Sequence, residues 1–155
     1  MNFFSNKIKV VTHDGSFHAD EVFACATLSL WAQKMGHKLE IIRSRDVGVV
    51  AGADIVVDVG MEYDPKRGRF DHHQKEGAGT HKNGIPFASF GLIWKHYGVI
   101  VCGNEEVFKT IEQKLVSPID AYDNGINISK VLTEGISDYT LAREMVYAFR
   151  SSWKD

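Results

Sequence analysis

Short apolar runs alternate with longer apolar stretches along the first hundred residues, which predicts alternating strands and helices. Residues 8–13, 39–43 and 54–60 are rich in β-branched side chains, and we interpret them as strands. Residues 19–35 contain no Gly or Pro and are apolar on most sides, so we expect a deeply packed helix that ends at Gly36.

The remaining pattern adds a hairpin and three more helices. Turn residues between positions 64 and 68 predict a hairpin that leads to Phe70. We expect helices over 88–97, closed by Gly98; after Asn104, with an apolar stripe that ends near Pro118; and over 138–150, capped by Ser137. The order of strands and helices predicts an α/β fold with a doubly wound, mainly parallel sheet flanked by helices.

Composition narrows the class of protein. The chain has 155 residues, of which 25% are charged and 44% hydrophobic, and this composition excludes a disordered chain. Its net charge of −2 excludes a generally basic protein that coats nucleic acid, but it allows a local basic pocket. The two cysteines are far apart, as in reduced buried thiols. The most apolar run, 22–32, is about half the length of a membrane span, so we expect a cytoplasmic protein without membrane association.

Histidine and acidic residues recur where the predicted strands end and loops begin. Each of these residues alone has an ordinary explanation as a cap or a packed side chain, but their repeated position at strand ends predicts a metal centre. The candidates, in chain order, are His13, His18, Asp20, Asp58, Asp71-His72-His73, Asp120 and Asp123.

The donor chemistry indicates which ions such a centre prefers. Imidazole and carboxylate ligands without a thiolate suit Mn²⁺, Mg²⁺, Co²⁺ or Zn²⁺. Two ions about 3.5–4 Å apart form a clamp for phosphoryl transfer, whereas a single zinc ion would leave several of these ligands unused. The positive charge of two divalent ions would equal the negative charge of three carboxylates and a bridging hydroxide. Such a site attracts an anionic phosphate.

These motifs resemble those of the DHH phosphoesterase superfamily, and more closely those of one branch, the Myg exonucleases (melanocyte proliferating gene family). The strings that carry the resemblance are Thr12-His13-Asp14-Gly15-Ser16-Phe17-His18-Ala19-Asp20-Glu21, Val57-Asp58-Val59-Gly60, Arg69-Phe70-Asp71-His72-His73, Ala88 to Gly98, and Asp120-Ala121-Tyr122-Asp123-Asn124-Gly125. They extend over nearly the whole chain.

The resemblance implies roles for individual residues. His13, His18 and Asp58 would hold one metal ion. The residues that would hold the other are Asp20, Asp58, His72 and Asp123, with Asp58 bridging the two ions. Asp120 or Asp14 could replace Asp123. His73 would contact the scissile phosphate and help to protonate the leaving group.

Four further residues are candidates for phosphate contacts, each with a plainer alternative. Ser89 could cap a helix or bind phosphate at the helix N-terminus. His81 and Lys82 could be solvated surface residues or could steer phosphate into the site. Arg69 could be a surface charge, but it stands directly before the Asp71-His72-His73 motif.

We therefore expect a divalent-metal-dependent phosphoester hydrolase, with two Mn²⁺ ions, that acts through a bridging hydroxide as a 3′→5′ exonuclease or oligonucleotide hydrolase. Its substrate would be a nucleotide or a short single-stranded nucleic acid. The alternatives are an inactive metal-binding module that needs a partner, and a small-molecule pyrophosphatase. We expect the metal-binding domain over 1–136 and a C-terminal helix over 137–155 that stops before the family's second domain, which a partner or a second copy could supply.

Overall fold

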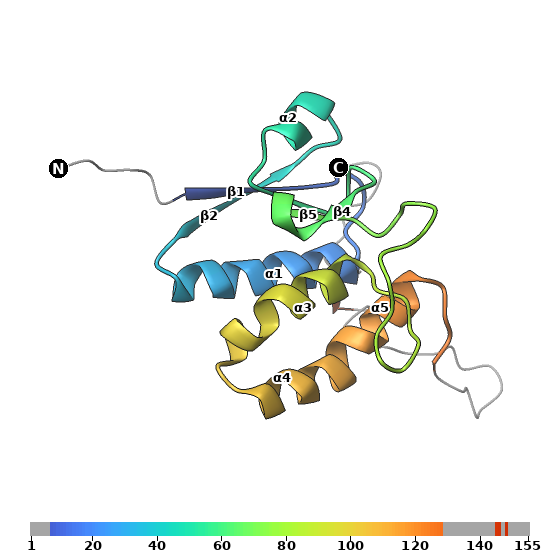
Figure 1. Ribbon diagram of the computed structural model, residues 1–155. Helices are drawn as coiled ribbons and strands as arrows, with labels where there is room; N and C mark the ends of the chain where they lie inside the picture. The colour runs from blue at the N-terminus through green and yellow to red at the C-terminus, as the bar shows by residue number, and fades with distance from the viewer. Residues whose placement is uncertain (1–6, 129–144, 147, 149–155) are drawn as a thin grey trace.

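The protein has an α/β fold built on a five-stranded sheet (Figure 1). The computed structural model describes residues 7–128, 145, 146 and 148. The strand order is β2-β1-β3-β5-β4, in which only the edge strand β4 runs antiparallel to its neighbour. The strands are β1 (Lys7–Thr12), β2 (Lys38–Arg43), β3 (Ile55–Val57), β4 (Tyr63–Asp64) and β5 (Arg69–Phe70). The predicted fold class, a mainly parallel sheet flanked by helices, is confirmed.

Helices cover both faces of the sheet, but unequally. The larger layer lies below the sheet in Figure 1 and contains α1 (Ala19–Lys34), α3 (Ser89–Cys102), α4 (Glu105–Ile111) and α5 (Ser117–Asp123). Among the helices of the described residues, α2 (Val47–Ala51) alone lies on the opposite face (Figure 1). Each face of the sheet has its own hydrophobic core. Alternate residues of a strand pack into one core or the other, because successive side chains point to opposite faces. Val10 packs in the core with α1 and α3, whereas Val11 packs with residues of α2.

The register of the sheet aligns the carboxyl ends of its central strands. Thr12 of β1 pairs with Val57 of β3, which in turn pairs with Phe70 of β5. The three residues that follow this row are therefore neighbours at one edge of the sheet: His13, Asp58 and Asp71. The chain turns outward from β1 to β2 and then returns past β1 to β3, so this edge lies at the topological switch point where α/β proteins bind ligands.

The third helix is longer than the sequence predicts. It does not end at Gly98 but continues to Cys102, and Gly103 ends it with a left-handed backbone (φ 66°). Gly98 has a packing role instead, because a Cβ atom there would lie 2.7 Å from the Trp94 ring and 2.9 Å from Phe108 of α4. The missing side chain lets α3 and α4 approach closely.

Pro118 also has a different place from the one predicted. It does not mark the end of the helical stretch, because α4 continues through the π-helical segment η2 (Glu112–Val116) into α5, where Pro118 lies in the first turn. There its missing N–H group leaves few backbone bonds unmade. The pattern did not predict the short α2, which Asp46 caps by accepting a hydrogen bond from Val49 N at 2.9 Å.

The third strand is shorter than predicted, and most of the last predicted helix falls on residues that the structure does not describe. β3 ends at Val57 rather than at Gly60, because Asp58 leaves the extended conformation (φ 56°). Ser137 and most of 138–150 lie outside the described residues. Within the described part of the chain, no helix has both the length and the apolar composition needed to cross a bilayer.

The close approach at Gly98 generates the first prediction. Gly→Ala inside a helix ordinarily stabilises it by about 1 kcal/mol. We expect Gly98→Ala to have the opposite sign and to lower the free energy of unfolding by about 1–3 kcal/mol, because the added methyl group overlaps the Trp94 ring. Urea unfolding would measure the change. Gly52→Ala is the control, since its Cβ would meet only two backbone oxygens, at 3.4 and 3.8 Å. Equal effects of the two variants would contradict the packing role.

Candidate metal centre

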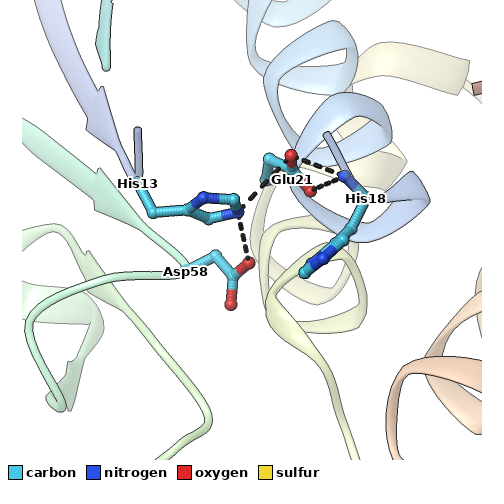
Figure 2. Close-up of side chains that lie close together, drawn as sticks. All are labelled: His13, His18, Glu21 and Asp58. Carbon is cyan, nitrogen blue, oxygen red and sulfur yellow. Dashed lines mark hydrogen bonds and ion pairs between the residues drawn. The ribbon is translucent and has the colours of Figure 1, made fainter. Parts of the chain in front are cut away.

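The first half of the site joins the end of β1 to the first turn of α1. Figure 2 shows the His13 ring pointing toward both Glu21 and Asp58, with His18 on the other side of Glu21. His13 Nε2 lies 3.4 Å from Glu21 Oε1 and 3.4 Å from Asp58 Oδ2. One ligand atom from each of the four residues falls within 4.8 Å of the others, so the group has the geometry of a metal site.

Glu21 is a member of this group that the sequence analysis did not single out. Its side chain is 2% exposed, and both of its carboxylate oxygens accept a hydrogen bond from His18 N, at 2.7 and 2.9 Å. An acidic residue three positions after a helix N-cap is the spacing of a capping box. This spacing could have indicated a fixed carboxylate at the helix start, but not that the same carboxylate faces His13.

The second half of the site lies beside the first and adds residues from two further segments, the loop after β5 and α5. His72 Nε2 lies 3.1 Å from Asp123 Oδ2 and 3.5 Å from Asp58 Oδ1. Asp20, His72 and Asp123 form one possible ligand set, and Asp58, His72 and His73 form another. The structure thus brings together all six residues predicted as metal ligands. Their assignment as ligands stays a prediction, which metal binding tests.

Asp58 connects the two halves. Its Oδ2 atom faces His13, whereas its Oδ1 atom faces His72. The backbone of Asp58 is left-handed, with φ 56°, a conformation that non-glycine residues adopt rarely and that concentrates at functional sites. Ser89 Oγ donates a hydrogen bond to Oδ1 at 3.4 Å. The carboxylate is therefore held between two groups of ligands, as a bridging ligand must be.

Two buried histidine nitrogen atoms that lack a hydrogen bond favour a bound cation. His13 Nε2 and His72 Nε2 are both buried without a hydrogen-bond partner, although carboxylate oxygens lie nearby. Buried polar groups are normally satisfied, so such atoms require an explanation. An imidazole nitrogen that faces carboxylates across a short gap is suited to share a divalent ion with them, and the residues present fit such an ion.

The electrostatics of the cluster lead to the same conclusion. The Asp58 and Glu21 carboxylates raise the pKa of His13 to about 9. Burial lowers the pKa of His72, but Asp123 and Asp58 outweigh it and raise the pKa to about 10. Burial and the neighbouring Asp58 raise the pKa of Asp20 well above its usual value. These shifts describe a buried excess of negative charge, which divalent cations would neutralise.

Asp20 has a second set of contacts, at the N-terminus of α3. Its Oδ2 atom accepts a hydrogen bond from Ser89 N at 3.1 Å, and its Oδ1 atom accepts one from Phe90 N at 2.6 Å. Ser89 is fully buried and begins the helix. Of the four residues predicted to contact phosphate in addition to His73, only Ser89 contacts the cluster.

His73 is held by its neighbour Asp71. Asp71 is 1% exposed, and its Oδ1 atom lies 2.7 Å from His73 Nδ1 and accepts a hydrogen bond from His73 N. A carboxylate at Nδ1 fixes the orientation of the ring and leaves Nε2 available. The His73 side chain is 53% exposed and lines a pocket of about 340 Å³ at the centre. The lining residues are His13, His18, Arg45, Asp58, Val59, Gly60, Met61, Asp71, His73 and Asp123.

Asp120 and His81 form a separate buried pair. His81 Nε2 lies 2.6 Å from Asp120 Oδ2, and the other oxygen of Asp120 accepts a hydrogen bond from Gly91 N at 3.0 Å. Burial raises the pKa of Asp120 to about 6, although His81 opposes this shift. The structure does not bring Asp120 into any of the described ligand sets or His81 into the pocket lining.

Three further candidates lie away from the ligand sets. Asp14 is exposed and pairs with Arg45 Nε at 3.1 Å. Arg69 Nη1 donates to the carbonyl oxygen of Ala53 at 3.2 Å, so its guanidinium contacts the backbone beside β3. Lys82 is exposed in the loop before α3. Asp14 and Lys82 therefore lie on the surface, and Arg69 has a structural contact.

The bridging position of Asp58 generates a prediction for metal binding. Asp58→Asn removes a charge from both halves of the site, so we expect the Mn²⁺ stoichiometry to fall from two per chain to one or fewer and the affinity to fall at least about tenfold. Isothermal titration calorimetry with elemental analysis would measure both. Asp46→Asn is the matched control, because Asn caps a helix as well as Asp does. Unchanged stoichiometry in Asp58→Asn would contradict a shared ligand.

Glu21 allows its capping role to be separated from metal binding. Glu21→Gln keeps an oxygen that can accept the His18 N–H bond but removes the negative charge. We expect a loss of Mn²⁺ affinity of about tenfold or more, with a change in unfolding free energy within about 1 kcal/mol. If calorimetry shows that Mn²⁺ binds the variant and the native chain equally, Glu21 serves only as a cap.

Comparison with known proteins places these residues in a family. The MYG1_exonuc family profile, described as an uncharacterised protein family (UPF0160), matches residues 9–155. Human MYG1 exonuclease is 38% identical over 137 residues, which cover 77% of this chain and 36% of the human protein. The MYG1 protein C694.04c of Schizosaccharomyces pombe is 37% identical over 164 residues, which cover 96% of this chain and 50% of that protein.

The chain therefore spans between about a third and a half of the length of these curated relatives. No solved structure matches it. The family match confirms the resemblance to the Myg exonucleases that the sequence motifs indicate, and it extends over all the described ligand sets. The chain belongs to the MYG1 exonuclease family.

Proposed function

We propose that the chain carries the centre of a divalent-metal-dependent phosphoesterase that removes nucleotides from the 3′ end of a short single-stranded RNA. The observation that supports this most is the position of Asp58, whose two oxygens face two separate sets of His and acidic residues. Mn²⁺ is the preferred ion, because mixed imidazole and carboxylate ligands suit it.

The protein residues would divide the work of phosphodiester hydrolysis. Two divalent ions, when bound, neutralise charge on the phosphate and lower the pKa of water. His13 and His72 face different oxygens of Asp58, and each would help to hold one ion. Asp71 fixes the His73 ring, so His73 can donate a proton to the oxygen that leaves phosphorus.

The pocket and the net charge favour a short substrate. A volume of about 340 Å³ is at the small end for ligand pockets and accommodates about one nucleotide. A net charge of −2 favours a short substrate, because a long nucleic acid requires an extended basic track. The human and bovine relatives are called MYG1 exonuclease, which agrees with removal of terminal nucleotides.

Mn²⁺-dependent hydrolysis of a short single-stranded RNA tests the proposal. With RNA labelled at the 5′ end, we expect a ladder of products shortened one nucleotide at a time. Asp58→Asn should reduce the rate at least about 100-fold, because the phosphate then lacks the charge neutralisation of an intact centre. Asp46→Asn is the control and should retain the native rate.

The other outcomes identify the alternatives. Equal rates for Asp58→Asn and the native chain would overturn the proposal and indicate a contaminating nuclease. Hydrolysis of inorganic pyrophosphate but not of RNA would favour a small-molecule pyrophosphatase. Binding of two Mn²⁺ ions without turnover of either substrate would favour a metal-binding module that requires a partner.

A further inference from the structure

We propose that the pocket contains a subsite for the nucleotide next to the scissile phosphate, in which Arg45 binds a second phosphate and Met61 contacts the sugar or base. This inference rests on the proposed function, because it concerns the substrate of the same centre. It specifies a substrate with more than one phosphate and with a nucleoside, rather than a simple phosphodiester or an inorganic anion.

Arg45 supplies a permanent positive charge to the pocket. Among the described lining residues it is the one Lys or Arg side chain, and the rest of the lining includes three carboxylates. Its guanidinium lies beside the His13 side of the cluster. A Cβ atom built on Gly15 would be 3.4 Å from Arg45 Nη2 and 3.3 Å from His13 Nδ1. A phosphate bound by Arg45 would therefore be close to the centre.

Arg43, the last residue of β2 and two positions before Arg45, is not equivalent to Arg45. Its Nε atom donates to His13 O at 3.3 Å, another of its nitrogen atoms donates to Gly15 O, and its guanidinium lies 4.0 Å from the centre of the Phe17 ring. Through these contacts Arg43 holds the loop between β1 and α1 in place. Arg45 has an exposed carboxylate partner, Asp14, and its own side chain is 62% exposed. An exposed ion pair of this kind contributes little free energy, so a substrate phosphate can replace Asp14 as the partner.

Met61 gives the pocket an apolar surface on a fixed backbone. It is 61% exposed and lines the pocket, so its apolar side chain is open to a bound molecule. Its backbone is left-handed (φ 59°), and its N–H group donates to Asp71 Oδ2 at 2.7 Å. The backbone of Met61 is therefore fixed at the pocket, where Val59 and Gly60 also form part of the lining. A flexible thioether suits a sugar or a flat base but gives an inorganic anion nothing to contact.

The test measures binding, so that it does not depend on turnover. The probes are two forms of a diadenosine with a phosphinate link, in which carbon replaces both bridging oxygens, so that neither bridging bond to phosphorus can be hydrolysed. One form carries phosphates on both of its ends and the other carries none. In Mn²⁺, calorimetry should show that the native chain prefers the doubly phosphorylated probe by about tenfold. Arg45→Ala should remove most of this preference.

Arg67→Ala is the matched control, because Arg67 is also an exposed arginine paired with an exposed carboxylate, Glu62, but it does not line the pocket. It should keep the preference for terminal phosphates. Equal preferences in the Arg45 and Arg67 variants, or no preference in the native chain, would overturn the phosphate subsite.

The second arm tests the apolar surface. Met61→Asn, which tolerates the left-handed backbone, should weaken binding of both diadenosine probes about fivefold or more and leave binding of methylenediphosphonate, which has no nucleoside, unchanged. Met35→Asn is the control, since Met35 is 52% exposed but lies outside the pocket lining. Equal effects of the two Met variants would overturn the role of Met61.

The result is separable from that of the hydrolysis assay. If RNA is not hydrolysed but both variants lose binding as described, the subsite stands and the proposed activity fails. If RNA is hydrolysed in an Asp58-dependent way but neither variant changes probe binding, the activity stands and the subsite fails.

Discussion

The arrangement of the molecule depends on two buried carboxylates that hold the N-terminus of α3. Asp20 accepts hydrogen bonds from Ser89 N and Phe90 N, and Asp120 accepts one from Gly91 N. These are amide groups that have no partner within the helix, and the helix dipole favours negative charge there. A side chain at Gly91 would overlap the Asp120 carboxylate, so only glycine permits this contact. Three helices, α1, α3 and α5, are joined through it.

The same contacts place the candidate ligands. Asp20 is fixed next to His72 and Asp123, and Asp120 lies one helical turn before Asp123 on α5. The strand register independently aligns His13 and Asp58 at the edge of the sheet. The candidate metal centre therefore forms where the helix layer meets the carboxyl ends of the strands. Many of its acidic groups are buried, an arrangement that divalent cations would stabilise.

Several parts of this arrangement could be predicted from residue order. Short β-branched runs indicated the first three strands, and a longer apolar stretch indicated α1. The rule that ligands gather at the carboxyl ends of parallel strands indicated His13 and Asp58. The boundaries were less predictable. Gly98 is a helix breaker by local preference, yet packing of α4 against α3 makes it an interior helix residue. Pro118 likewise lies in the first turn of α5, which continues directly from the preceding π-helical segment.

The sequence by itself determined the fold class and the chemical types of the candidate ligands. Apolar runs, helix caps and turn residues determine local structure over a few positions, so they can be recognised without the tertiary structure. Tertiary structure decided which carboxylate faces which partner. The pairing of Asp120 with His81 spans 39 residues, and that of Asp20 with Phe90 spans 70. It also decided that Glu21 faces His13 and that Arg45, rather than Arg43, lines the pocket. Such contacts depend on how whole elements pack, which no local pattern encodes.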